Sequence, residues 1–198
     1  MTRLAPTPSQ TVGPFYGYAL PFTGGGEVAP AGHPDTITVR GRVYDGAGQP
    51  VPDALLEFWQ AAPDGSLAGA PGSLRRDPVT GAVLGRDGVD FTGFGRVATD
   101  ADGGWTLRTL PPGAHRDGAI PHLAVCVFAR GLLHHLYTRI YLPEHLDALA
   151  LDPALGALPP ERRATLVATV ERERVYRFDI RLQAGQGPEE ETVFFDFG

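Results

Sequence analysis

Histidine is the side chain in this sequence best suited to bind a metal ion or to move a proton near neutral pH. The six histidines are His33, His115, His122, His134, His135 and His145. His134 and His135 are adjacent within a predicted strand, so their side chains would project from opposite faces and could not share one metal ion. No H-x-H, H-x-x-E or H-E-x-x-H spacing occurs in the chain. The histidines therefore predict no self-contained metal site.

Other motifs that carry chemistry are equally scarce. The sequence holds no G-x-S-x-G elbow, phosphate-binding loop or dinucleotide fingerprint. Asp100 and Asp102 could suggest calcium, but Asp-x-Asp-Gly is a common composition of tight turns, which is the interpretation we favour. The single cysteine, Cys126, lies within an apolar run, where a cysteine is more often a small buried side chain than a nucleophile. The residues alone thus predict a scaffold without an active site of its own.

Arg130 is the unusual charge in this sequence, because it directly follows the apolar run LAVCVFA of residues 123–129. That run has the length and the β-branched content of a buried strand. Residues 132–142, LLHHLYTRIYL, form a second such run, and Gly131 favours a tight turn between the two. An arginine at the end of a core strand either extends into solvent or binds an anion. The pattern leaves both possibilities open.

Short alternating segments dominate the rest of the chain and predict strands. Beyond the two runs above, the predicted strands are residues 37–45, 54–61, 91–98, 105–110, 175–182 and 192–197. Residues 63–88 contain several Pro and Gly turn signals and predict a long loop. Helix is expected only at 143–150 and 159–168, where proline and glutamate favour short helical starts. This pattern predicts an all-β fold, an antiparallel β-sandwich with little helix and long loops.

Length and composition limit the possible function classes. A chain of 198 residues suits one domain, and we expect an extended arm and loop at 1–34 followed by a single β-sandwich at 35–198. The net charge of −6 argues against binding to nucleic-acid phosphates. One cysteine permits no internal disulfide. The sequence shows no signal peptide and no apolar run long enough to span a bilayer, so the default location is cytoplasmic.

Three segments of the sequence resemble the intradiol ring-cleavage dioxygenases. They are GRVYDGAGQPVPDALLEFWQA at 41–61, FGRVATDADGGWTLRTLPPG at 94–113, and the terminal YRFDIRLQ and ETVFFDF. Two further segments, TPSQTVGPFY at 7–16 and FARG at 128–131, resemble one type of subunit within this family. It is the alpha-type subunit of members that act on protocatechuate. The resemblance implies a β-sandwich fold and the opening of a catechol ring by dioxygen at a non-haem ferric ion. In the catalytic subunit two tyrosines and two histidines, the latter as H-x-H, hold that ion.

The iron ligands of the family are missing at the matching positions here. Val125 and Val127 are taken to stand where the two histidines would be. His115 follows Pro112, Gly113 and Ala114, where one tyrosine is expected, and no tyrosine occurs near Val83, where the other is expected. Ferric iron is a hard cation that prefers phenolate and imidazole ligands. The resemblance therefore implies a subunit that binds no metal, with Fe³⁺ held by a partner beta subunit.

The resemblance also implies that this subunit lends residues to a substrate pocket shared with the beta subunit. The matching positions are Arg130, Gly13 and Pro14, with weaker support for Thr11, Phe15 and Tyr16. Arg130 would bind the carboxylate of protocatechuate, contributing about 1.5–3 kcal/mol when it is shielded from solvent. A different interpretation is a stand-alone β-sandwich that binds a ligand or a protein without catalysis.

Overall fold

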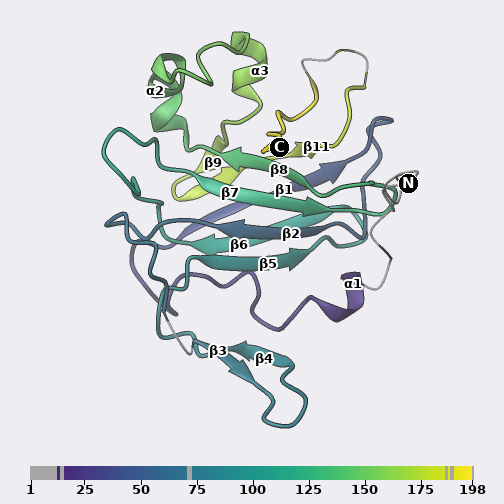
Figure 1. Ribbon diagram of the computed structural model, residues 1–198, viewed down its shortest axis with the longest axis vertical. Helices are drawn as coiled ribbons and strands as arrows, with labels where there is room; N and C mark the ends of the chain where they lie inside the picture. The colour runs from purple at the N-terminus through teal and green to yellow at the C-terminus, as the bar shows by residue number, and fades with distance from the viewer. Residues whose placement is uncertain (1–12, 14–15, 71–72, 186, 188–189, 198) are drawn as a thin grey trace, which may run out of the picture.

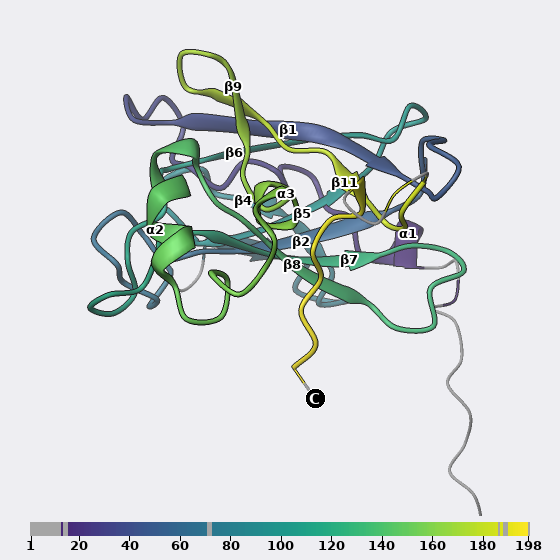
Figure 2. The ribbon, with the colours of Figure 1, turned by 90° about the horizontal axis from the view of Figure 1, so that it is seen from above.

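The computed structural model describes residues 13, 16–70, 73–185, 187 and 190–197. Two β-sheets pack face to face, as the view from above shows (Figure 2). Short helices cover one edge of the sandwich, and a small β-hairpin extends beyond the opposite edge (Figure 1). The all-β fold with little helix that the sequence predicts is confirmed.

The first sheet is built around β1 (Ile37–Tyr44). One edge of β1 pairs antiparallel with β6 (Gly104–Thr109). The other edge pairs in parallel, first with β10 (Val175–Arg177) and then with β11 (Ile180–Arg181). β9 (Thr169–Arg172) extends the sheet beyond β10. Residues far apart in the sequence thus meet in one layer.

The second sheet is antiparallel throughout, in the order β5–β2–β7–β8. Its strands are β5 (Phe94–Ala98), β2 (Leu55–Trp59), β7 (Leu123–Phe128) and β8 (Leu136–Ile140). β7 and β8 form the predicted hairpin, and Gly131 in its turn has φ of 86°, a conformation that glycine adopts at little cost.

The core lies between the two sheets and is formed by the apolar residues that alternate along each strand. Val39 of β1 and Leu107 of β6 meet Leu56 of β2 and Val125 of β7, and all four are at most 1% exposed. Fully burying one such side chain contributes about 1.5–3 kcal/mol. This alternation fixes which face of β7 and β2 looks into the core and which looks outward.

The structure corrects four expectations. The predicted loop at 63–88 contains a hairpin, β3 (Leu74–Arg76) with β4 (Val83–Arg86). Residues 192–197 form no strand, although Phe195 makes an isolated bridge to Tyr137. The predicted strand at 175–182 is interrupted between β10 and β11. His134 and His135 precede β8 instead of lying within it.

Both predicted helical regions contain short helices. The first holds a 3₁₀ turn, η1 (Pro143–His145), followed by α2 (Leu146–Leu151), and the second holds α3 (Pro160–Ala164). Buried Leu149 and Leu166 from these regions pack with Tyr141 in a smaller apolar cluster. Burial of these side chains holds the helices against the edge of the sandwich.

The described part of the predicted N-terminal arm packs against the sandwich. A single helical turn, α1 (Tyr16–Ala19), is followed by a segment in which Val28 is 2% exposed. The backbone N–H groups of Val28 and Ala29 donate to the carbonyl of Arg108 in β6. The predicted boundary between arm and domain at residue 34 stays a prediction.

Candidate functional site

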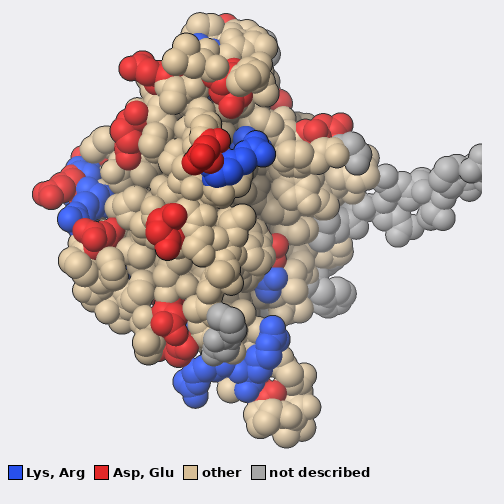
Figure 3. Space-filling model, turned by 60° about the vertical axis from the view of Figure 1, so that its left-hand side comes forward, with Lys and Arg blue, Asp and Glu red and all other residues tan. Residues whose placement is uncertain are grey.

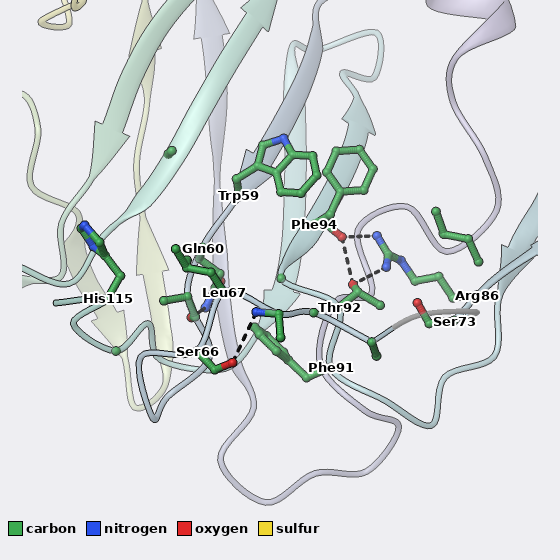
Figure 4. Close-up of a pocket in the computed structure, with 18 of the residues that line it drawn as sticks. Trp59, Gln60, Ser66, Leu67, Ser73, Arg86, Phe91, Thr92, Phe94 and His115 are labelled. Atoms are coloured by element: carbon green, nitrogen blue, oxygen red, sulfur yellow. Dashed lines mark hydrogen bonds between the residues drawn. The ribbon is translucent and has the colours of Figure 1, made fainter.

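A large pocket lies at one end of the second sheet. Its volume is about 920 Å³, and its walls come from the ends of β2, β5 and β7 together with the β3–β4 hairpin and the loops beside it (Figure 4). Trp59 and Phe94 form an aromatic wall, with their ring centroids 4.5 Å apart. Arg86 extends beneath this wall, and His115 lies on the opposite side (Figure 4). The arrangement has the size and the mixed lining of a small-molecule site.

Two residues near the start of β7 line the pocket. They are His122, which directly precedes the strand, and Ala124 within it. Val125 and Val127 are at most 1% exposed and point into the core between the sheets. They cannot be the counterparts of metal-binding histidines that face a pocket, so that part of the sequence interpretation is wrong. The pocket-facing positions could have been predicted from the sequence. Leu123, Val125 and Val127 are apolar and alternate along the strand, so the even-numbered side chains are expected to face outward.

The pocket residues do not fit a ferric ion. Two imidazoles, His115 and His122, line it with ring centroids 6.3 Å apart. Among the described residues no tyrosine lines it, and Ala124 offers no ligand atom. Within the part of the chain that the structure describes, no group of three or more His, Cys, Asp and Glu could hold a metal ion. The hard phenolate donors that ferric iron prefers are lacking here.

His122 is held in one orientation by its own backbone surroundings. Its Nδ1 donates to the carbonyl of Ile120 at 2.9 Å, since a carbonyl can only accept. Burial is the main cause that lowers the pKa of His122, and the charges of Arg139 and His115 lower it further. The ring is therefore neutral over a wider range of pH than a free histidine.

Arg130 lies at the other end of the second sheet, in the turn between β7 and β8. Six residues of extended chain separate it from Ala124, roughly 20 Å at the usual rise per residue. Its guanidinium forms an ion pair with Asp53 and is 64% exposed. An exposed ion pair of this kind contributes only about 0–1 kcal/mol. Arg130 could therefore exchange Asp53 for another carboxylate.

Tyr16 links the N-terminal segment to Arg130. It is 7% exposed, and its hydroxyl donates to the carbonyl of Asp53 at 2.8 Å. Its ring lies 6.5 Å from that of Phe128. Burial is the main cause that raises the pKa of Tyr16, and the charge of Asp53 raises it further. The charge of Arg130 and a hydrogen bond with the backbone of Arg130 act in the opposite direction. The structure thus brings Tyr16 and Arg130 together.

Gly13, three residues before Tyr16, is exposed, and a side chain added there would have open space around it. Pro14, Thr11 and Phe15 lie outside the described residues. The substrate-binding roles of Arg130, Gly13 and Pro14 stay predictions.

Cys126 of β7 is 9% exposed, and burial, with a smaller contribution from the charge of Glu57, raises its pKa to about 12. At pH 8 only roughly one thiol in 10⁴ is then ionised. Because the thiolate is the reactive form, we expect the folded protein to react with 5,5′-dithiobis(2-nitrobenzoate) at least about a hundredfold more slowly than the urea-unfolded chain. Release of one equivalent of thionitrobenzoate within the mixing time, from folded protein, would contradict this expectation.

The helices of the described residues include none long and apolar enough to cross a membrane.

Comparisons with known proteins were made on sequence and on structure. The sequence model of a family described as dioxygenase matches residues 13–184. The chain is 42% identical to the protocatechuate 3,4-dioxygenase alpha chain of Burkholderia cepacia, over 99% of this chain and 100% of the other. It is 32% identical to the protocatechuate 3,4-dioxygenase beta chain of the same species, over 75% of this chain and 65% of the other.

Among solved structures, the fold is similar to the dioxygenase domain of a dioxygenase carbohydrate-binding protein fusion from Streptomyces sp. SirexAA-E. The TM-score is 0.57 at 28% identity, over 91% of this chain and 100% of the other. Sequence and fold therefore agree, and the resemblance read from the sequence is confirmed.

Proposed function

Because this chain belongs to the dioxygenase family, in its intradiol ring-cleavage group, we propose that it acts as the alpha subunit of a protocatechuate 3,4-dioxygenase. Its partner is a beta subunit of the same family that carries a ferric ion. The assembly combines protocatechuate with dioxygen to give 3-carboxy-cis,cis-muconate. The iron supplies the activation of the ring and of dioxygen, and this chain supplies part of the substrate pocket. The cytoplasmic location predicted from the sequence stays a prediction.

The kinds of metal-ligand atom that line the pocket are the main support for this proposal. A chain of this fold that performed the reaction alone would need phenolate and imidazole ligands facing its pocket. Ala124 and the lack of a lining tyrosine remove that possibility for the described residues. The full-length similarity to an alpha chain, against a shorter one to a beta chain, supports the same division of labour.

The substrate-binding residues that we propose for this chain are Arg130, Gly13 and Pro14. Arg130 is exposed, and the described residues give it one ion pair, with Asp53. Because an exposed ion pair is weak, the guanidinium can exchange Asp53 for an anion presented by a partner. Gly13 is three residues from Tyr16, whose ring is buried near Arg130. A glycine without a side chain lets its backbone approach an aromatic substrate closely.

Expression of the chain with and without a beta partner tests the proposal. Alone, we expect a colourless, iron-free and poorly soluble product, because a surface meant for an obligate partner is exposed. With the partner, we expect a red, iron-containing assembly that cleaves protocatechuate. Iron content and visible absorption of the purified products are the measurements.

Two outcomes would overturn the proposal. If the isolated chain bound iron and opened the ring, the assignment to the alpha subunit would be wrong. If the chain were soluble and monomeric, and formed no assembly with the beta subunit, it would instead be a stand-alone binding module.

A further inference from the structure

The charged side chains that line the pocket of this chain are basic. Two arginines, Arg76 and Arg86, line it, and no acidic residue lines it within the described part of the chain, although the whole chain carries a net charge of −6. The space-filling view shows basic side chains gathered over the β3–β4 hairpin, the part of the chain that supplies both arginines (Figure 3). A concave site lined by charge of one sign concentrates ions of the opposite sign.

Arg86 is the better placed of the two cations. Its guanidinium donates to the carbonyls of Gly24 and Phe94 and to the hydroxyl of Thr92. These bonds hold the side chain in place and use three of its five N–H groups. The described residues give it no ion pair with a carboxylate, and the nearby Asp87 is exposed at the surface.

A cation in that position is costly unless an anion joins it. Burial lowers the pKa of Arg86 to about 10, which is the expected direction when a charge loses water without gaining an opposite charge beside it. The guanidinium is planar and keeps two N–H groups available, a geometry that suits a carboxylate.

The wall above Arg86 suits a planar ring. Trp59 is 56% exposed although it is a large aromatic residue, and it lies against Phe94 and faces the pocket. Phe91 and Leu67 add further apolar surface. Exposed aromatic surface around a concavity is typical of sites that bind an apolar or aromatic ligand.

We propose that this pocket binds a small aromatic carboxylate, with its ring against Trp59 and Phe94 and its carboxylate on Arg86. No metal takes part, and the ligand is bound without being transformed. The inference depends on the pocket of this chain and not on the role proposed for Arg130.

Binding of 4-fluorobenzoate, followed by ¹⁹F NMR on the purified assembly, tests the proposal. This probe carries the ring and the carboxylate but no vicinal hydroxyls with which to chelate iron. We expect Arg86→Gln to weaken binding by roughly tenfold or more, the usual effect of losing a charge-assisted bond. Arg75→Gln is the matched control, because Arg75 is an exposed arginine of the same hairpin that is not among the residues lining the pocket. It should change binding by less than about twofold.

A second variant keeps the bonds of Arg86 intact. Ala124 is half-buried and faces the pocket from β7, so Ala124→Phe fills the space without removing any hydrogen bond. We expect it to abolish binding while circular dichroism and assembly remain as in the parent protein. Parental affinity in both Ala124→Phe and Arg86→Gln would overturn the proposal, as would no binding at all by the parent assembly. Arg130→Ala should leave binding in the pocket unchanged. The role proposed for Arg130 and the role proposed for the pocket can therefore fail independently of each other.

Discussion

Replacing Arg130 with alanine in the alpha–beta assembly is expected to raise KM for protocatechuate by roughly tenfold to a hundredfold. The reason is the loss of a charge-assisted bond to the substrate carboxylate, about 1.5–3 kcal/mol when it is shielded by a partner. Iron content should stay at the parental level, because Arg130 lies in an exposed turn of a chain whose described residues hold no metal site. Steady-state kinetics and a colorimetric iron assay measure the two quantities.

Two comparisons separate this role from a general loss of positive charge. Arg116 is an exposed arginine in a loop, and Arg116→Ala should leave KM within about twofold. Catechol lacks the carboxylate, so the rate at which the assembly cleaves it should respond little to Arg130→Ala. If KM for protocatechuate were unchanged in Arg130→Ala, the substrate contact proposed for this residue would be abandoned.

The strands of the sandwich could be predicted from the sequence because each one carries its own signal. Alternation in residues 37–44, and the continuous apolar run at 123–129, report burial directly. The turn at Gly131 was also visible, since a backbone angle that favours glycine separates two strand-like runs. These features depend on residues close together in the chain.

The pocket could not be predicted in the same way. Trp59, Arg86 and His122 come from three segments, and only pairing between distant strands brings them together. The β3–β4 hairpin was missed because its strands are short and have little apolar alternation, so the turn signals around them dominate. For β7, the positions of the iron ligands were assigned to the wrong face, since a shift of one residue along a strand reverses every side chain.

The interruption between β10 and β11 depends on a residue of another strand. Phe178 lies between these strands and is 3% exposed, and its N–H donates to the carbonyl of Arg40 in β1. Next to Arg40, Gly41 leaves room for the backbone of Phe178. Asp179 then accepts a hydrogen bond from the N–H of Arg42. Alternation in 175–182 contains no sign of this detour, because its cause is the missing side chain at position 41.

Gly41→Ala is therefore expected to be strongly destabilising. A Cβ atom added to Gly41 would lie 1.8 Å from the carbonyl oxygen of Phe178, and a backbone atom inside the sandwich has little freedom to withdraw. Overpacking of this kind costs about 3 kcal/mol or more. For a chain of this size the thermal midpoint should fall by roughly 6–12 °C. Differential scanning fluorimetry of the purified assembly measures it.

Gly17 provides the matched control, since nothing lies within 4 Å of a Cβ built there and the residue belongs to α1. Alanine suits a helix better than glycine, so Gly17→Ala should leave the midpoint unchanged or slightly raised. An equal midpoint for Gly41→Ala and the parent would mean that β10 and β11 can shift without cost. In that case the separation of these strands would follow from the sequence around Phe178 and not from contact with Gly41.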